Sequence, residues 1–170
     1  IASDSYAVFF GSYNGGSNGL GTLQAFGDLR PGNSPASVSF GGNLELGSNT
    51  VTHIELGGEL IGEFDQLLIA GDFLTDGDLE VSLINGFSLD FNQEFLIGDI
   101  GGTRFGGFDG LSEGDRVGNF GGFDLFISYQ AGTGNDISLF TSVPEPGTAG
   151  FLACCAVGWT LRRRRRRLAV

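Results

Sequence analysis

Two stretches decide the fold: residues 42–56, which read GNLELGSNTVTHIEL, and residues 71–83, which read GDFLTDGDLEVSL. Each begins with a Gly-Asn or Gly-Asp pair and a short apolar segment, which a polar turn joins to a predicted strand. Gly42 corresponds to Gly71 and Leu56 to Leu83, so the second copy is slightly shorter and carries a small deletion in its turn. A weak repeat of this length is typical of a β-solenoid, in which each repeat buries its apolar face on its neighbours.

Short runs rich in β-branched and aromatic residues continue on both sides of this repeat, separated by Gly, Asn and Asp turns. Some alternate cleanly: Leu79, Val81 and Leu83 fall on one face of a strand. Residues 14–21 form a Gly/Asn/Ser stretch, which we predict to be a loop too flexible to pack. No segment before residue 147 keeps a helical period, so we predict an all-β domain. The predicted strands are 6–10, 22–26, 36–40, 43–46, 50–56, 66–70, 78–83, 94–100, 123–130 and 136–141.

The C-terminal segment, residues 143–170, has a different character. Val143, Pro144, Glu145 and Pro146 lead into an uncharged apolar run, residues 147–161, for which we predict one short hydrophobic helix. This run is shorter than the roughly 20 residues that span a bilayer. A block of arginines follows, and it should stay on the cytoplasmic side as a membrane stop because charge is costly inside the bilayer. The block consists of Arg162, Arg163, Arg164, Arg165, Arg166 and Arg167.

This order of a Val-Pro-Glu-Pro motif, a short apolar run and an arginine tail resembles the PEP-CTERM sorting signal. The resemblance implies export by the general secretion machinery, transient inner-membrane anchoring, recognition by an exosortase and delivery to the cell envelope, outer surface or extracellular matrix. The expected organisation is an exported domain, residues 1–142, and a sorting signal, residues 143–170. An ordinary C-terminal membrane anchor with a proline linker is the alternative. Because the chain begins at Ile1 without a signal peptide, we expect a processed or truncated N-terminus.

The exported region carries a second resemblance. The segments that carry this resemblance are 30–35 (RPGNSP), 64–67 (FDQL), 77–81 (GDLEV), 127–129 (ISY) and 134–139 (GNDISL). Together they are similar to the end of an autotransporter-type β-strand repeat passenger, a kind of adhesin-like surface protein. The resemblance implies a short right-handed parallel β-helix, or solenoid, whose C-terminal β region closes the stack. A β-sandwich built from the same strands is the alternative fold.

Charge excludes some classes of partner. Residues 1–143 contain 19 acids, no lysine and only Arg30, Arg104 and Arg116 as basic residues, which gives a net charge of −16. We therefore expect no binding to nucleic acid, because nothing neutralises its phosphates. The only cysteines, Cys154 and Cys155, lie in the apolar run, so the exported domain has no disulfide.

Two acidic stretches invite a metal interpretation. Residues 131–136 (AGTGND) are similar to one calcium-binding nonapeptide of toxin-type β-rolls, which makes Asn135 and Asp136 weak metal candidates. Only one copy is present, so a simple turn between two strands is the plainer interpretation. Residues 72–83 fail as an EF-hand, because positions three and twelve are Leu74 and Leu83. We predict no bound metal and no cofactor.

Candidate catalytic residues are few. His53 is the only histidine, and we interpret it as a strand residue rather than a member of a triad or zinc site. Acids are plentiful enough to form a glycosidase-like pair, but the single tryptophan, Trp159, lies outside the domain. The sequence favours a non-catalytic structural or adhesive surface protein with an exopolysaccharide or other surface proteins as partners. A carbohydrate- or calcium-binding β module is the alternative, and a polysaccharide-cleaving enzyme is the third.

Overall fold

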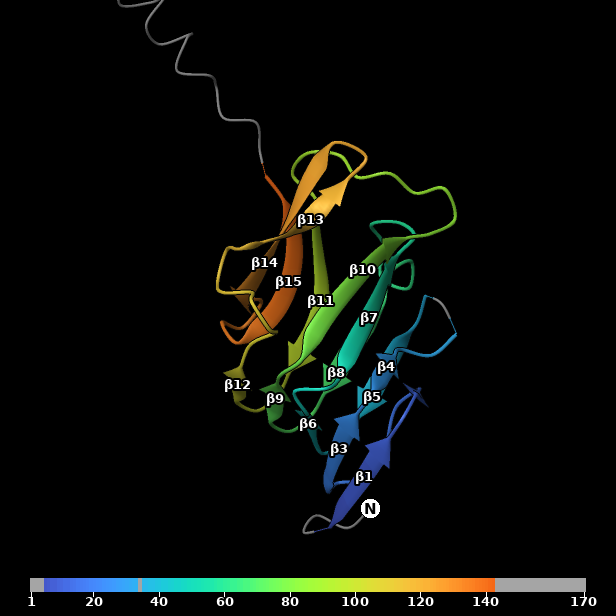
Figure 1. Ribbon diagram of the computed structural model, residues 1–170, viewed down its shortest axis with the longest axis vertical. Coiled ribbons are helices and arrows are strands. Elements are labelled where there is room, and N and C mark those ends of the chain that lie inside the picture. Colours follow the sequence, from blue (N-terminus) through green and yellow to red (C-terminus); the bar gives the residue numbers. More distant parts are fainter. Residues whose placement is uncertain (1–4, 34, 143–170) are drawn as a thin grey trace, which may run out of the picture.

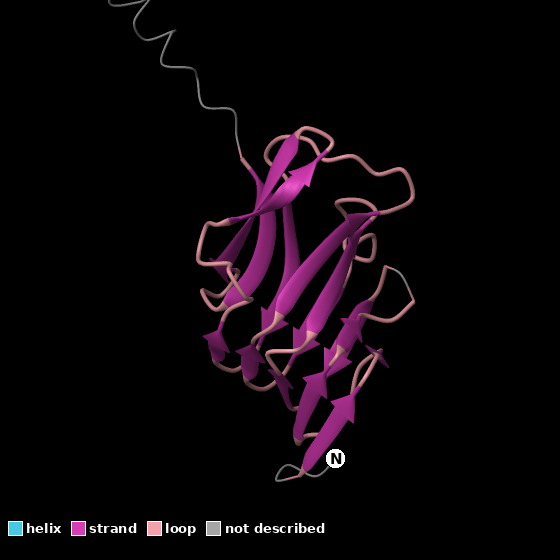
Figure 2. Cartoon of the chain, viewed as in Figure 1, coloured by secondary structure: helices cyan, strands magenta, loops and turns pink. Residues whose placement is uncertain are grey.

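The computed structural model describes residues 5–33 and 35–142. Every regular element in this part of the chain is a β-strand, and it contains no helix (Figure 2). The all-β prediction is therefore confirmed for these residues. The strands are β1 (Tyr6–Phe10), β2 (Tyr13–Asn14), β3 (Thr22–Phe26), β4 (Asp28–Arg30), β5 (Ser37–Phe40), β6 (Asn43–Leu46), β7 (Val51–Leu56), β8 (Gln66–Ile69), β9 (Phe73–Thr75), β10 (Asp78–Leu83), β11 (Glu94–Ile100), β12 (Arg104–Gly106), β13 (Arg116–Phe120), β14 (Phe123–Ala131) and β15 (Asp136–Thr141).

These strands form three sheets, which are called sheets A, B and C below. Sheet A has the order β1-β3-β6-β9-β12, sheet B β10-β7-β4-β2 and sheet C β13-β14-β15-β11-β8-β5. From β3 to β12 the chain visits sheets A, B and C in turn (Figure 1). All pairs in sheets A and B are parallel. In sheet C, β5, β8 and β11 pair in parallel and the pairs from β11 onward are antiparallel.

The repeat in the sequence corresponds to strand pairing. Leu44 of β6 is the register partner of Phe73 of β9, the equivalent position in the second copy. Ile54 of β7 is likewise the partner of Val81 of β10. Parallel partners of this kind place equivalent side chains on the same face, so a repeated apolar pattern becomes a continuous buried row.

The interior consists of such rows. In sheet A, Leu23, Leu44 and Phe73 are successive register partners, and none is more than 2% exposed. In sheet C, Phe40 pairs with Ile69 in the same way, and both are buried. Fully burying one such side chain is worth about 1.5–3 kcal/mol, so the rows supply most of the stabilisation of a domain whose described residues contain no cysteine.

Glycines line the corner where the chain passes from sheet C into sheet A. A Cβ atom added at Gly42 would overlap the carbonyl oxygen of Gly21, and one at Gly71 would lie 2.8 Å from that of Gly42. At Gly102 the added atom would lie 2.6 Å from the Gly71 carbonyl. Successive passes of the backbone therefore come closer at this corner than any residue with a side chain allows. The set Gly42, Gly71 and Gly102 is called the glycine corner.

The residue after each of the first two corner glycines ties one pass of the chain to the next. The Oδ1 atom of Asn43 accepts a hydrogen bond from the backbone N–H of Asp72 at 2.8 Å. The Oδ1 atom of Asp72 accepts one from the N–H of Thr103 at the same distance. Side chains that satisfy the backbone of a neighbouring strand fix the stacking distance as well as the turn.

The structure contains further strands that the sequence pattern did not predict: β2, β4, β9, β12 and β13. The first four have two or three residues each, too few to show an alternating pattern, and β13 is interrupted by Gly118. Residues 15–21 form a loop, as predicted, but the expectation that it does not pack was wrong, because Ser17 forms a parallel bridge with Phe40 and its N–H donates to the carbonyl of Ser39. Gly16 permits this contact, since a Cβ there would overlap the same oxygen.

The C-terminal strands β13–β15 extend sheet C as an antiparallel region at the end of the molecule opposite β1 (Figure 1). Tyr129 of β14 joins this region to the preceding loop: its hydroxyl accepts from the N–H of Phe108 and donates to the carbonyl of Leu111. Its ring lies 4.6 Å from the Arg104 guanidinium, and burial raises the pKa of the phenol.

Candidate functional site

The residues of the predicted sorting signal, from Val143 through the arginine block 162–167, lie outside the described residues. Their role is taken up below as a proposal. Within residues 5–33 and 35–142, no helix is long and apolar enough to cross a membrane.

The turn considered as a calcium nonapeptide uses its polar side chains as internal links. Asp136 is 2% exposed, and its two carboxylate oxygens accept from the N–H groups of Ile100 and Thr133, each at 2.7 Å. The Asn135 amide donates to the carbonyls of Ile100 and Gly102. The turn between β14 and β15 is thereby joined to the turn after β11. No group of three metal-ligating side chains converges anywhere in the described part of the chain.

Two acidic residues of the repeat also accept hydrogen bonds from backbone N–H groups. Asp72 accepts a hydrogen bond from the N–H of Thr103, next to the glycine corner, and Asp76 accepts one from the N–H of Gly77 at 2.9 Å. Asp78 is exposed at the start of β10. These residues lie in turns and at a strand end, and none belongs to a group of three metal-ligating side chains within the described residues.

His53 lies in β7, as predicted, and is the centre of a charged cluster on the outer face of sheet B. Its Nδ1 atom lies 3.1 Å from a carboxylate oxygen of Glu80 on β10. Its Nε2 atom lies 3.2 Å from Asp28 Oδ1 on β4 and 3.0 Å from the Arg30 guanidinium. The Nε2 atom can donate to Asp28 or accept from Arg30, but it cannot do both at once. Three neighbouring strands are therefore joined through one imidazole ring.

The contacts of this cluster lower the pKa of Asp28. The hydrogen bond from His53, and after it the one from the Ser12 hydroxyl at 3.1 Å, holds the pKa of Asp28 below its usual value. Ser12 thus bonds to the carboxylate rather than to the imidazole. A serine nucleophile needs the opposite arrangement, in which its hydroxyl bonds to histidine and the carboxylate orients the far side of the ring.

A hollow of about 270 Å³ adjoins this cluster. Its walls include Asn14, Arg30, His53, Glu55 and Asp65. Asp65 is 2% exposed and accepts from the N–H groups of Ala36 at 2.7 Å and Glu55 at 2.9 Å.

Burial raises the pKa of Asp65, although its two backbone hydrogen bonds work in the opposite direction. One oxygen of Glu55 is buried and has no hydrogen-bond partner. The hollow, called the sheet B hollow below, is therefore lined by two carboxylates, a guanidinium and amide groups.

Sequence reasoning did not bring these residues together. His53 and Glu80 occupy equivalent positions in the two copies of the repeat, so the repeat was the one available signal for their contact. Asp28 and Arg30 lie on the very short strand β4, which the alternation of apolar and polar residues in the sequence did not predict.

Comparison of the chain with protein-family models, curated proteins and solved structures found no match.

Proposed function

We propose that residues 1–142 form a short right-handed parallel β-solenoid that serves as a non-catalytic structural or adhesive component of the cell surface or extracellular matrix. The observation that carries the proposal is the use made of the polar side chains. Asn43, Asp72, Asn135 and Asp136 each bond to the backbone of a neighbouring pass of the chain. Their donor and acceptor groups are used in hydrogen bonds that hold successive passes of the chain together. Such internal bonding is typical of a rigid structural module.

The solenoid part of the proposal is supported by the strand order. From β5 to β12 the chain visits three sheets in rotation, and its parallel partners are about 30 residues apart, which is the connectivity of stacked coils. The alternative β-sandwich consists of antiparallel sheets, whereas sheets A and B are parallel throughout. The antiparallel strands β13–β15 would then be the closing region of the stack.

The non-catalytic part is supported by the charged cluster. Both nitrogens of His53 face charged partners that already hold the ring, and Ser12 is bonded to Asp28. The acidic surface would also repel the acidic polymers on which β-helix polysaccharide enzymes act.

Residues 143–170 are the part of the chain that we propose directs it to the cell surface. We propose that secretion machinery exports the domain, that the apolar run 147–161 holds it briefly in the inner membrane, and that an exosortase acts at the motif around Glu145. The experiment is to express the full gene in a host that has an exosortase and to determine the C-terminus of the surface-exposed protein by mass spectrometry. We expect a C-terminus close to Val143, and retention of Glu145→Ala as unprocessed precursor in the inner membrane.

A surface-exposed protein that keeps residues 162–167 would contradict the proposed sorting and processing. The structural or adhesive role is tested separately, by coating beads with the released protein and measuring attachment of the producing cells and binding of their exopolysaccharide. Heat-unfolded protein is the control. Equal attachment to folded and unfolded coats would contradict a role for the folded domain.

The second candidate, a module that binds a carbohydrate or calcium, is favoured by one observation, the sheet B hollow. A glycan array probed with and without calcium distinguishes the two functions. Binding that is lost in Asp65→Ala but kept in Asp109→Ala, an exposed acid elsewhere, would establish the binding module instead.

A further inference from the structure

A hollow of about 550 Å³ lies between the loop that follows β12 and the end of β14. Its walls come from Arg104 at the start of β12, from residues 106–113, and from Tyr129 and Gln130 on β14. All of them belong to a continuously described part of the chain. The volume is within the range of about 300–1,000 Å³ that is usual for small-molecule sites, whereas the sheet B hollow is smaller. We call it the Arg104 hollow.

Arg104 is held in the wall of this hollow without an acidic partner. Its guanidinium lies 4.6 Å from the centroid of the Tyr129 ring, and its Nη1 atom donates to the carbonyl of Gly106. The ring is fixed in turn, because the Tyr129 hydroxyl is bonded to the backbone of Phe108 and Leu111. Arg104 forms no ion pair with an acid among the described residues, although residues 1–143 contain 19 acids. The hollow therefore has a fixed guanidinium in its wall.

Most of the hydrogen-bonding capacity of Arg104 is unused. A guanidinium carries five N–H donors, and the bond to Gly106 is the one that it makes to the described part of the chain. The Nε atom is buried and has no partner there. Donors without acceptors are unfavourable away from water, so oxygen atoms of a bound molecule would supply what the guanidinium lacks.

Glu113 provides acceptors in the same hollow. Its carboxylate accepts from the N–H of Tyr129 at 2.5 Å and from the Ser128 hydroxyl at 2.8 Å, and these two bonds fix its position. A carboxylate has about four acceptor sites, so about half of them remain. Glu113 and Arg104 line the hollow without forming an ion pair with each other. Donors and acceptors are thus both available to a ligand.

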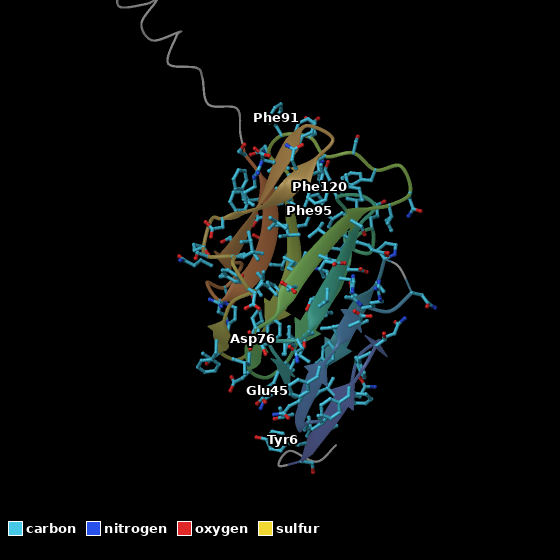
Figure 3. The ribbon with its side chains drawn as sticks, viewed as in Figure 1. Tyr6, Glu45, Asp76, Phe91, Phe95 and Phe120 are labelled. Atoms are coloured by element: carbon cyan, nitrogen blue, oxygen red, sulfur yellow. The ribbon has the colours of Figure 1, made fainter. Side chains whose placement is uncertain are left out.

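The other polar groups of the walls fit a ligand that is rich in hydroxyl groups. Ser112 and Gln130 are exposed, and each can both donate and accept, as a hydroxyl does. The walls favour neither sign of charge, because a cation would meet the Arg104 guanidinium. An anion would meet the acids of sheet A, where Asp76 follows β9, the partner of β12, and Glu45 lies on the next strand (Figure 3). An uncharged ligand therefore fits best.

We propose that the Arg104 hollow binds an uncharged sugar unit of a polysaccharide, with Arg104 donating to neighbouring hydroxyl groups and Glu113 accepting from them. The planar fork of arginine suits two adjacent oxygen atoms. The usual hydrolysis of a glycosidic bond needs two carboxylates, and Glu113 is the only one lining the hollow within the described residues, so the site binds without cleaving. The proposal deepens the adhesive function proposed above and rests on it for its biological role.

The first test is isothermal titration calorimetry of the full chain, in a non-ionic detergent without a sugar headgroup. The probes are short oligosaccharides of glucose, galactose and mannose, and oligogalacturonates of matched length. We expect an uncharged oligosaccharide to bind, and the oligogalacturonates to bind at least about tenfold more weakly at low salt, where the acids of the domain repel them most. Binding of none of the uncharged probes, or tighter binding of an oligogalacturonate, would overturn the proposal.

The second test uses variants with the best uncharged probe. Arg104→Gln should weaken binding at least about tenfold, and Arg104→Lys nearly as much, because an ammonium keeps the charge but lacks the fork. Arg116→Gln is the matched control, since it removes the same charge from an exposed arginine that does not line the hollow. It should bind within about twofold of the natural chain. Gln130→Ala, at an exposed position, should weaken binding several-fold with unchanged thermal melting, so the test does not depend on the folding of the Arg104 variants.

Three results would place the ligand elsewhere and overturn the proposal. Equal weakening in Arg104→Gln and Arg116→Gln would show an effect of overall charge alone. Full affinity in Arg104→Lys would show that the fork is not used. A loss in Asp65→Ala with none in Arg104→Gln would place the sugar in the sheet B hollow.

Nuclear magnetic resonance locates the contact directly. On titration of the labelled chain with the same probe, the backbone N–H signals of Gly107 and Gly110, which line the hollow, should shift. Shifts confined to other parts of the chain would overturn the proposed site.

The bead assay described above separates this site from the adhesive function. Calorimetric binding by a protein whose coated beads attach no cells would leave the site standing and contradict the adhesive function. Beads coated with Arg104→Gln that attach cells as well as the natural protein would leave the adhesive function standing and overturn the role proposed here for the hollow.

Discussion

Single glycines at the glycine corner set how closely successive passes of the chain can approach. The space that a Cβ at Gly42 would need is occupied by the carbonyl groups of Leu20 and Gly21. These are backbone atoms, which cannot rotate away as the tip of a side chain can. The close approach of the two passes therefore depends on the absence of a side chain at residue 42.

Replacing Gly42 with alanine should lower the free energy of unfolding by about 1–3 kcal/mol, the usual range for an atom forced into a packed interior. The measurement is urea denaturation of the wild-type chain and the variant. Gly107→Ala is the matched control, because a Cβ there would make only an ordinary contact, 3.4 Å from the Tyr129 ring. A Gly42→Ala variant as stable as Gly107→Ala would contradict the close stacking at the glycine corner.

Asp28 is one residue whose ionisation should link the free energy of unfolding to pH. A carboxyl group whose pKa is lower in the folded than in the unfolded protein stabilises the fold at pH values above its usual pKa. That contribution is lost as the pH falls through the lower, folded value. Since His53 and Ser12 lower the pKa of Asp28, acidification below about pH 4 should remove its contribution.

The measurement is the free energy of unfolding against pH for the wild-type chain and for Asp28→Asn. The difference between the two should be largest near neutral pH and should shrink in acid. A difference that stays constant from neutral pH to about pH 2 would show that the ionisation of Asp28 does not stabilise the fold.

Among the elements, the turn between β14 and β15 is held to the turn after β11 by Asp136. Asp136→Ala would leave the N–H groups of Ile100 and Thr133 without their acceptor, and should cost about 1–3 kcal/mol in stability. Asp136→Asn keeps one acceptor oxygen and should cost less. Asp109→Ala, at an exposed position, should change stability by no more than about 0.5 kcal/mol.

Thermal and urea denaturation of these three variants, each with and without calcium, measures both effects. If Asp136 is a structural link, the loss in Asp136→Ala is the same in the presence and absence of calcium. A loss that appears only when calcium is present would contradict this role and indicate a metal ligand.

Elements with a repeating or alternating pattern could be predicted from the sequence. Strand β10 alternates along its length, and its apolar positions are half-buried while Asp78, Glu80 and Ser82 are exposed, as expected. Strand β9 has only Phe73, Leu74 and Thr75, so its assignment depends on its partner β6 rather than on its own residues. Short strands acquire their structure from neighbours that sequence periodicity cannot identify.

The candidate site was less predictable than the fold. His53 could be assigned to a strand, but its contacts with Asp28 and Glu80 depend on the register of three strands from separate passes of the chain. Asp65 is buried because the hollow forms around it, and nothing in its local sequence distinguishes it from the exposed acids. Charged residues are usually exposed, so a buried one is visible only in the structure.

In the domain as a whole, charge opposes compaction. The net charge of −16 in residues 1–143 is spread over turns and strand ends, such as Asp76 and Asp78. Exposed charges repel one another until salt screens them, at distances beyond about 8 Å at physiological ionic strength. Calcium, magnesium and sodium chloride should therefore each raise the melting temperature gradually. A sharp, stoichiometric rise with calcium alone would contradict this explanation and indicate a specific site.

The arrangement of the domain rests on the parallel stacking of equivalent strands from the two copies of the repeat. Nuclear Overhauser effects of the isotopically labelled chain test this stacking most directly. We expect contacts between Leu44 and Phe73 and between Ile54 and Val81, with the spacing pattern of parallel strands throughout sheets A and B. Strong contacts between opposed α-protons within β6, β7, β9 and β10, the mark of antiparallel pairing, would contradict it.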